Sequence, residues 1–414
     1  MTRGITAVGA TLVITLVTWL LSHPLEPIST TQRIAQLMGA LALVVLACML
    51  LIATRWHFID RLFAGQDKAY VTHKWLGITT LVLLAAHLLV LHAANLQRVD
   101  QGMLVHFGAP AAILFVALTA FALLTRKVPY ESWKLIHLLT IVAYLMGAAH
   151  YYGASSYDPF GASPFSIWLN LTNLAGLCAV VYIALFYKRL GLRYRYRVTA
   201  CQSVASKAIQ ITAEPVGKPL SFRPGQFAFI SIPQLEFASH PFTISSAPGE
   251  ALQFTVSSLG DDTARLVQGL SAGAQLRVSG PYGGFNYTKG SASQVWVAAG
   301  IGITPFRSFY RSGIPSCFSI DLFYTYRGEH DGVYLDELRA IDQPNLRIHL
   351  IDTTQSGRLT MDTIISAAPC AQLRDLYFCG PKPMRNALKK SARPLAPVIH
   401  HFNAEEFQFG RRNT

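Results

Sequence analysis

Four histidines in the apolar front half of the chain form two spaced pairs of potential metal ligands. His73 and His87 lie fourteen residues apart, and His137 and His150 lie thirteen apart. Each pair falls in a stretch long and apolar enough to cross a membrane, where an ionisable side chain is costly and therefore indicates a functional site. Two histidines on each of two neighbouring helices would supply four axial ligands, enough for two stacked haems. The chemistry that this arrangement predicts is electron transfer across a bilayer.

The two spacings differ in the angle that they set between the two histidines around the helix axis. Either spacing separates the ligands by about 20 Å along the helix axis, which leaves room for two haems. Fourteen residues are close to four turns, so His73 and His87 share a face, whereas thirteen residues are about 3.6 turns. His137 and His150 therefore require a local kink, near Gly147, or haems approached from different sides. For any single histidine the alternative is a packing residue or part of a proton relay.

The predicted helices three and five run in the same direction because one helix lies between them. His73 and His137, near the cytosolic ends, then pair on an inner haem, and His87 and His150 pair on an outer one. Ligation by two histidines leaves no open iron position, so each haem would pass electrons rather than bind substrate.

Composition divides the chain of 414 residues into two regimes. The sequence is 51% hydrophobic and 14% charged, with a mean hydropathy of +0.33, but the apolar residues concentrate before about residue 188. Each apolar run is near the ~20 residues that span the hydrocarbon core of a membrane. These runs predict six helices at 4–22, 33–54, 71–94, 104–125, 131–152 and 165–187.

An even number of spans puts both ends of the chain on one side, and the basic residues decide which. Connections two-to-three and four-to-five and the exit from helix six are basic, whereas the other connections carry little beyond Arg33 and Arg98. The basic residues are Arg55, Arg61, Lys68, Lys74, Arg126, Lys127, Lys134, Lys188, Arg189, Arg193, Arg195 and Arg197. The positive-inside rule therefore predicts a cytosolic C-terminal half. The net charge of +13 then needs no nucleic acid, because juxtamembrane basic residues facing anionic lipid account for much of it.

Six cysteines are scattered along the chain without a CxxC pair. This pattern argues against an iron–sulfur cluster or a zinc site. Any electron carrier is therefore expected to be organic or haem.

From about residue 193 short alternating strands predict a small antiparallel barrel, with a Pro-Gly corner at 224–225. The stretch 240–246 falls where a flavin-binding barrel needs it. Thr243 offers a hydroxyl and a backbone N–H near a flavin ring, and His240 is within reach of a phosphate. Gly260 and Thr263 stand where a turn enters a helix, whose free N–H groups suit a pyrophosphate.

A buried strand at 294–299 runs into a glycine turn and a helix. Gly300 and Gly302 let the backbone approach a phosphate, although Pro305 replaces the third glycine of a full dinucleotide motif. Arg327, after a strand at 321–326, could meet a 2′-phosphate, or could be a solvated strand end. Cys379, after a strand at 376–378, would put a thiol beside a nicotinamide, or could be an ordinary buried cysteine. The tail at 402–407 offers an aromatic ring to stack on a flavin.

In this order the motifs resemble the NADPH oxidase and ferric reductase superfamily of transmembrane flavocytochromes b, and look most like its bacterial NADPH oxidases. The resemblance covers nearly the whole chain and rests on H-x13-H and H-x12-H, HPFT at 240–243, GxGxTPF at 300–306, CGP at 379–381 and FNxExF at 402–407. It implies a six-helix transmembrane bundle followed by a ferredoxin-reductase-like module. The expected domains are a haem domain at 1–190, an FAD-binding barrel at 191–290 and an α/β NAD(P)H-binding domain at 291–414.

The resemblance also implies roles for individual residues. The haem ligands are His73, His87, His137 and His150; the FAD residues are His240, Pro241, Phe242, Thr243, Ser245, Ser257, Gly260 and Thr263; the nucleotide residues are Gly300, Gly302, Thr304, Pro305, Arg327, Cys379, Gly380 and Pro381. Many relatives have Lys or Arg where Ser257 stands, so a flavin-phosphate contact is missing and FAD binds loosely. Thr243, Cys379 and Phe407 are the expected catalytic residues, with Phe407, or alternatively Phe409, covering the flavin until hydride transfer.

The expected activity is electron transfer from NADPH, with NADH as an alternative, through FAD and two b haems to an outer acceptor. That acceptor is O2, giving superoxide; ferric iron and a periplasmic redox partner are the alternatives. His92 and His106, near the outer face, are candidates for the acceptor site. A channel with a nucleotide-sensing domain is the competing class and would lack haem. We expect a multi-pass protein of the bacterial cytoplasmic membrane, with no obligatory protein partner.

Overall fold

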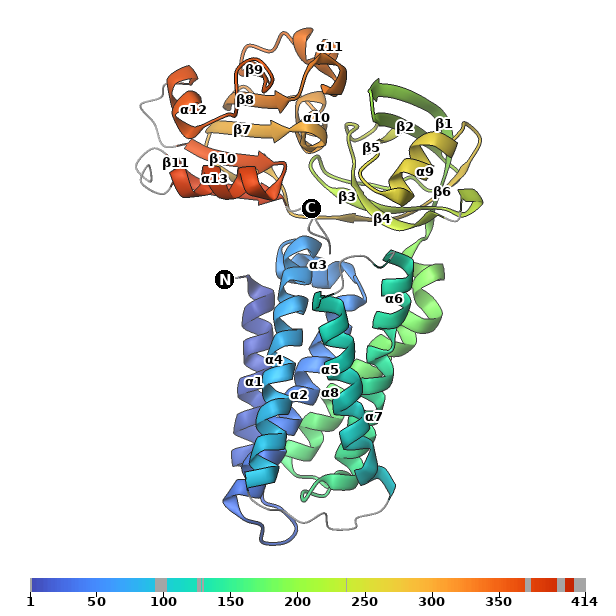
Figure 1. Cartoon of the computed structure of the whole chain (residues 1–414), viewed down its shortest axis with the longest axis vertical. Helices are drawn as coiled ribbons and strands as arrows, with labels where there is room; N and C mark the ends of the chain where they lie inside the picture. The colour runs from blue at the N-terminus through green and yellow to red at the C-terminus, as the bar shows by residue number, and fades with distance from the viewer. Residues whose placement is uncertain are drawn as a thin grey trace. The chain divides into compact units, whose positions relative to one another are not determined.

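The computed structural model of the chain describes residues 2–93, 103–124, 128, 130–235, 237–368, 374–392 and 399–405. These residues form two compact units, the first ending at Lys188 and the second beginning at Arg189. Figure 1 shows that the first unit is helical and that the second contains two sheets with helices.

The first unit contains the six apolar spans that the sequence predicts. Each is long and apolar enough to cross a membrane, so the six-helix bundle is confirmed. The spans are α1 (Arg3–Leu20), α2 (Thr30–Ala53), α4 (Gln66–Ala93), η1 (Met103–Phe107) with α5 (Gly108–Leu124), α6 (Tyr130–Leu138) with α7 (Thr140–Ala154), and α8 (Pro164–Val181) with the start of the π-helical η2 (Tyr182–Gly191). A short helix that was not predicted, α3 (His57–Phe63), lies between α2 and α4.

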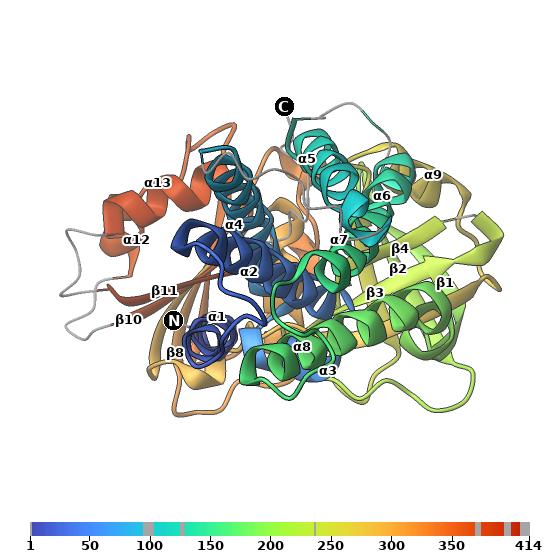
Figure 2. The ribbon, with the colours of Figure 1, turned by 90° about the horizontal axis from the view of Figure 1, so that it is seen from below.

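Helix α2 lies at the centre of this bundle. It packs against α1, α4, α7 and α8, and the view in Figure 2 shows it between them. Of its most apolar window 56% is buried, against 28% or less in the other spans. Its start is set locally, because the Ser29 hydroxyl accepts a hydrogen bond from the N–H of Gln32 at 3.1 Å and so caps the helix. Main-chain groups of α2 are therefore in reach of several neighbouring helices.

The first sheet of the second unit has six strands, all paired antiparallel, in the order β4-β3-β6-β1-β2-β5. Its strands are β1 (Tyr194–Ala205), β2 (Ala208–Pro215), β3 (Phe227–Ile232), β4 (Phe237–Thr243), β5 (Leu252–Ser257) and β6 (Gln275–Tyr282), with η3 (Pro233–Leu235), α9 (Asp261–Gly269) and η4 (Tyr287–Lys289) between or after them. A bridge from Ile244 to Phe254 in β5 joins the two ends of the sheet. The predicted antiparallel barrel is confirmed.

The second sheet has five parallel strands in the order β11-β10-β7-β8-β9. The strands are β7 (Ser293–Ala299), β8 (Ser319–Tyr326), β9 (Leu346–Asp352), β10 (Arg374–Cys379) and β11 (Ile399–Glu405); the helices are η5 (Gly300–Ile303), α10 (Thr304–Arg311), η6 (Glu329–Asp331), α11 (Leu335–Arg339), α12 (Met361–Ala367) and α13 (Lys382–Ala392). Three of the strands were predicted; β9 and β11 were not.

Alternate side chains of β7 enter opposite cores. Val295 and Val297 belong to one buried cluster, and Trp296 and Ala298 belong to another. Successive side chains of a strand point to opposite faces, and a parallel sheet covered by helices on both faces needs apolar residues at nearly every position. This is why residues 294–299 form a continuous apolar run.

A buried carboxylate connects the start of β8 to the adjacent strand β9 and to β10, the strand beyond β7. The side chain of Asp321 is fully buried and lies 2.7 Å from Arg347, 2.9 Å from Arg374 and 3.0 Å from His349. Burial alone would raise the pKa of Asp321, but the hydrogen bonds from His349 and Arg347 and the charges of the two arginines hold it well below its usual range. The carboxylate therefore stays ionised and stabilises this part of the sheet.

Replacing Asp321 with asparagine should lower the Tm of the solubilised chain at pH 7 by roughly 5–10 °C, because the buried Arg374 loses its counter-charge. A carboxylate whose pKa is depressed by folding contributes stability above its unfolded pKa of about 3.9, and this contribution is lost as the pH falls through the folded pKa. The difference in Tm between D321N and the wild type should therefore narrow below about pH 4. Calorimetry measures both effects, with the exposed Asp342→Asn as control; equal Tm values at pH 7 would contradict the prediction.

Candidate cofactor sites

Three of the four spaced histidines in the membrane unit are oriented by the main chain. In each, the ring Nδ1 lies at hydrogen-bond distance from a carbonyl oxygen: His73 from Met49 at 3.2 Å, His87 from Ala35 at 2.7 Å and His150 from Val105 at 2.9 Å. A carbonyl oxygen can only accept, so Nδ1 carries the proton and Nε2 keeps its lone pair. Histidine ligands of metals are commonly oriented in this way. The arrangement leaves Nε2 of all three rings available as a ligand.

The rings of His73 and His137 face each other at the distance that a shared metal requires. Their centroids lie 6.2 Å apart and their planes meet at 68°. A metal about 2 Å from each Nε2 sets the two centroids about 6 Å apart, because each centroid lies roughly 1 Å behind its nitrogen. The ring of Trp133 stacks on that of His137, with the two centroids 5.0 Å apart. These residues fit a metal held between two histidines.

The pair His87 and His150 depends on glycines. A Cβ at Gly108 would lie 2.6 Å from the ring of His150, and one at Gly39 would lie 3.3 Å from the ring of His87. A side chain at 108 would displace the His150 ring, so the start of α5 needs glycine to leave room for that ring. The assignment of all four histidines as haem ligands stays a prediction.

The helix that carries His137 and His150 is interrupted between the two residues, but not at Gly147. Helix α6 ends at Leu138 and α7 begins at Thr140, with Leu139 between them. Gly147 lies within α7, which continues without interruption. The one interruption between His137 and His150 is thus at Leu139, two residues after His137, and not at Gly147.

Strand β4 carries the predicted flavin motif. Thr243, at its end, is 3% exposed, and its hydroxyl is buried with no hydrogen-bond partner among the described residues. A buried hydroxyl without a partner is costly, which fits a site completed by a polar ligand. The side chain of His240, predicted to reach a phosphate, already has partners within the protein. Its ring stacks on Phe237, and its Nε2 lies 3.7 Å from the carboxylate of Asp262.

The two N–H groups that immediately precede α9 are hydrogen-bonded within the protein. The hydroxyl of Thr263 accepts hydrogen bonds from the N–H groups of Leu259 and Gly260 at 3.0 and 3.1 Å. Asp262, in the same turn, pairs with Arg265 at 2.5 Å. The predicted pyrophosphate contact concerns the N–H groups of the first turn of α9, which follow these two, and it stays a prediction. Ser257, at the end of β5, is partly exposed.

The glycine turn and the Cys-Gly-Pro segment meet at the carboxyl ends of β7 and β10. These two strands are neighbours, and the chain proceeds from β7 to β8 on one side and returns to β10 on the other. Ligands of open α/β sheets bind at such a switch point. The approach is close: a Cβ at Gly302 would lie 2.2 Å from the carbonyl oxygen of Cys379. Thr304 and Pro305 then open α10, and Gly380 and Pro381 follow β10.

Cys379 and Arg327 occupy different environments. Cys379 is fully buried, and burial, with a smaller contribution from Glu405, raises the pKa of its thiol well above the usual value. It is therefore a neutral thiol rather than a thiolate. Arg327 is exposed directly after β8, where it is free to contact solvent or a ligand. Phe407 and Phe409 lie outside the described residues.

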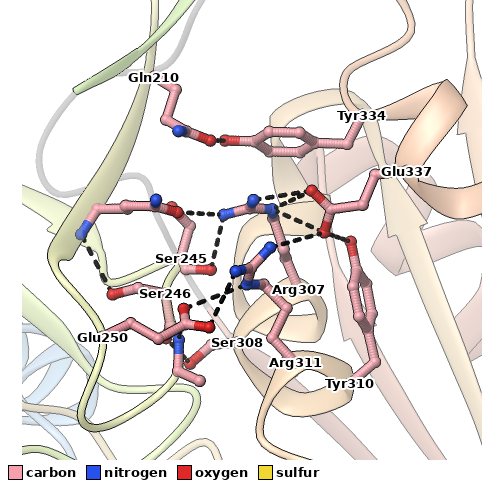
Figure 3. A network of polar contacts seen from close by, with 12 residues as sticks. Gln210, Ser245, Ser246, Glu250, Arg307, Ser308, Tyr310, Arg311, Tyr334 and Glu337 are labelled. Carbon is pink, nitrogen blue, oxygen red and sulfur yellow. Dashed lines mark hydrogen bonds and ion pairs between the residues drawn. The ribbon is translucent and has the colours of Figure 1, made fainter. Parts of the chain in front are cut away.

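A cluster between the barrel and the parallel sheet was missed from the sequence (Figure 3). It centres on Arg307 of α10, whose guanidinium lies 2.7 Å from the carboxylate of Glu337. Ser245 belongs to this cluster: it is fully buried and its hydroxyl accepts a hydrogen bond from Thr255 at 3.2 Å, so its role toward FAD stays a prediction. The one signal in the sequence was the pair Arg307 and Arg311, four residues apart, which equally fits a solvated helix face.

Three family profiles match successive parts of the chain. They are "Ferric reductase like transmembrane component" at 38–148, "FAD-binding domain" at 193–286 and "Oxidoreductase NAD-binding domain" at 296–390. The fold and these matches define a multi-pass membrane protein with flavin- and pyridine-nucleotide-binding domains. The chain belongs to the NADPH oxidase and ferric reductase superfamily.

Individual relatives align with nearly the whole chain or with about half of it. Ferric/cupric reductase transmembrane component 2 of Saccharomyces cerevisiae is 22% identical, covering 93% of this chain and 55% of its own length. The ferredoxin–NAD(+) reductase component of the alkene monooxygenase system of Xanthobacter autotrophicus is 27% identical, covering 46% of this chain and 63% of its own length. The chain thus spans 55% to 63% of the length of these two relatives. A solved structure, "Ferredoxin reductase in carbazole 1,9a-dioxygenase", aligns with 51% of this chain and 68% of its own at 22% identity and a TM-score of 0.43.

Proposed function

We propose that this protein transfers electrons from cytosolic NADPH, through FAD and two b haems, to O2 at the outer face of a bacterial cytoplasmic membrane, forming superoxide. When bound, FAD takes a hydride and releases its electrons singly, and the haems carry single electrons through the bilayer. The protein's own contribution is to bind these groups, to orient them and to keep water away from them.

The observation that carries the proposal is the histidine geometry. The 6.2 Å between the ring centroids of His73 and His137 matches the separation of two ligands of one iron, and the main-chain hydrogen bond at Nδ1 of His73 leaves its Nε2 available as a ligand. Carbonyl oxygens of Met49 and Ala35, both in the central helix α2, hold the Nδ1 protons of His73 and His87. A single helix thereby orients one ligand of each predicted haem.

At the predicted flavin site, the end of β4 supplies the buried hydroxyl of Thr243. At the predicted nucleotide site, η5 supplies backbone N–H groups at the start of α10, where the helix dipole favours a phosphate. Arg327 is available for a 2′-phosphate, which supports NADPH over NADH. The basic connections of the helical unit support a cytosolic position for both sites.

Ferric iron is the second candidate acceptor, because a relative named as a ferric/cupric reductase aligns with 93% of this chain. The two candidates differ in the product at the outer face, since O2 would give superoxide and Fe³⁺ would give Fe²⁺. His106 in η1 is exposed and His150 is hydrogen-bonded to the neighbouring Val105, so η1 lies beside the predicted outer haem ligand. His92 is exposed at the end of α4.

The test is to purify the full chain in detergent, add FAD and NADPH in air and measure dismutase-sensitive superoxide per NADPH oxidised. About two superoxide ions per NADPH are expected, because each NADPH carries two electrons and each O2 takes one. Haem bands that become reduced while little superoxide forms would contradict O2 as acceptor, and ferric citrate would then be tested in its place. Protein without haem absorbance would contradict the whole proposal.

A further inference from the structure

Helix α10 of the nucleotide-binding domain is tied to the flavin-binding barrel by buried polar side chains (Figure 3). We call this cluster the α10 clamp and define it by Ser245, Ser246 and Gln253 of the barrel and by Arg307, Ser308 and Glu337 of the nucleotide-binding domain. Ser245 and Ser246 are fully buried, and Arg307 is 3% exposed. The clamp is therefore part of the interior between the two domains and not a surface ion pair.

The guanidinium of Arg307 bonds to both domains at once. Its Nε and Nη2 donate to the carboxylate of Glu337 at 3.0 and 2.7 Å. Its Nη1 donates to the main-chain oxygen of Ser245 at 3.1 Å and to Oε1 of Gln253 at 2.7 Å. The ring of Tyr334 lies 4.2 Å from the guanidinium carbon. This planar group thus fixes both the distance and the orientation between α10 and the barrel.

Two further contacts hold the same helix against the same barrel segment. The Ser308 hydroxyl donates to the main-chain oxygen of Ser246 at 2.8 Å, and Arg311 pairs with Glu250 at 2.9 Å. Ser308 and Arg311 follow Arg307 in the sequence of α10 by one and four residues. Since three successive contacts join α10 to the segment that links β4 and β5, the helix has little freedom to slide along the barrel.

Both ends of the clamp lie next to a predicted reactive site. Ser245 is two residues after Thr243, the predicted flavin contact, and Arg307 is two residues after Pro305, where the predicted nucleotide turn ends. If the clamp is displaced, one predicted site therefore moves relative to the other, because only two residues of sequence separate the clamp from each site. Misplacing reacting groups by about 1 Å can lower a rate by about a hundredfold.

We infer that Arg307 is a positioning residue that holds the nucleotide turn at the distance from the flavin that hydride transfer needs. The inference rests on the proposed use of NADPH and FAD. The step it serves moves one hydride, two electrons with one proton, from the reduced nicotinamide to the flavin and leaves the oxidised nucleotide behind. Arg307 touches neither group in this role; it acts through α10 and the β4–β5 segment.

The test compares Arg307→Lys with the matched control Arg347→Lys. Arg347 also donates through Nε and Nη2 to one carboxylate, that of Asp321 at 2.8 and 2.7 Å, but both residues belong to the parallel sheet. In anaerobic stopped-flow, R307K should reduce bound FAD about ten- to a hundredfold more slowly at saturating NADPH, with half-saturation within about threefold of wild type. R347K should stay within about twofold of wild type both in the rate of FAD reduction and in the NADPH concentration of half-saturation.

A second measurement does not depend on turnover. Hydrogen–deuterium exchange of the full chain should rise about fivefold or more over 245–253 and α10 in R307K, and should not rise there in R347K. A wild-type rate of FAD reduction in R307K, or a fall no greater than its loss of bound FAD, would overturn the inference. Unchanged exchange at 245–253 would overturn it as well.

Tyr334→Phe covers the case in which R307K does not fold. The Tyr334 hydroxyl bonds to Gln210 at 2.9 Å and to Thr255 at 2.7 Å, and Thr255 in turn donates to the hydroxyl of Ser245 in the clamp at 3.2 Å. The change therefore loosens the barrel side of the clamp and keeps the ring beside Arg307. FAD reduction about three- to tenfold slower is expected, and an unchanged rate would contradict the inference. If wild-type FAD is not reduced by NADPH or NADH, the proposed function fails, while the exchange measurement still decides whether Arg307 couples the two domains.

Discussion

Replacing His87 with alanine should halve the haem content of the purified protein, from about two per chain to about one, and abolish electron transfer to any outer acceptor. His87 lies close to four turns from His73 along α4, and its Nδ1 is held by the carbonyl of Ala35, so its loss removes one ligand of the predicted outer haem alone. His73 and His137 keep their own geometry, because their rings face each other at the other end of the bundle.

Pyridine haemochrome spectra give the haem content, and steady-state assays with O2 and with ferric citrate give the transfer. Bound FAD should still be reduced by NADPH at the wild-type rate, because the change lies in the other unit. His92→Ala is the matched control, since His92 lies on the same helix and is exposed; it should retain about two haems. An H87A variant with both haems and full transfer would show that His87 is not a ligand.

Replacing Gly302 with alanine should lower the rate of FAD reduction by NADPH about a hundredfold. The new Cβ would lie 2.2 Å from the carbonyl oxygen of Cys379 and 2.7 Å from its carbonyl carbon. Both are main-chain atoms at the end of β10, so the glycine turn and the strand must separate. Since the predicted nucleotide site is made where these two segments meet, the nicotinamide would lose its position.

The measurement is anaerobic stopped-flow of FAD reduction, with dithionite reduction of the haems as an internal check that the rest of the chain is intact. Gly269→Ala is the control, because its Cβ would meet Leu235 at an ordinary 3.6 Å and should cost no activity. G302A that retains its FAD and is reduced at the wild-type rate would place the nucleotide elsewhere.

Cys379 illustrates how burial limits what a motif implies. The sequence put a thiol beside the nicotinamide, and the structure has that thiol fully buried with a pKa raised well above the usual value. A neutral, enclosed thiol is unsuited to act as a nucleophile. Any role of Cys379 in the proposed reaction is therefore one of shape and contact.

The sequence by itself determined the features that depend on local composition. Six apolar runs of membrane-spanning length, strands such as β7 with continuous apolar residues, and turns marked by Gly300 and Gly302 follow from hydropathy and from backbone conformation. The fourteen-residue spacing of His73 and His87 belongs to this class, because a regular helix repeats its face at that interval.

Only the tertiary structure decided what depends on residues distant in sequence. The break at Leu139, between His137 and His150, could not be located from helix periodicity, since no Pro or Gly marks it. Arg307 and Glu337 lie thirty residues apart, and Ser245 lies sixty-two residues before Arg307; their bonds exist because two domains pack together. Hydropathy describes how a segment meets solvent or lipid, whereas a buried polar contact depends on which partner the fold supplies.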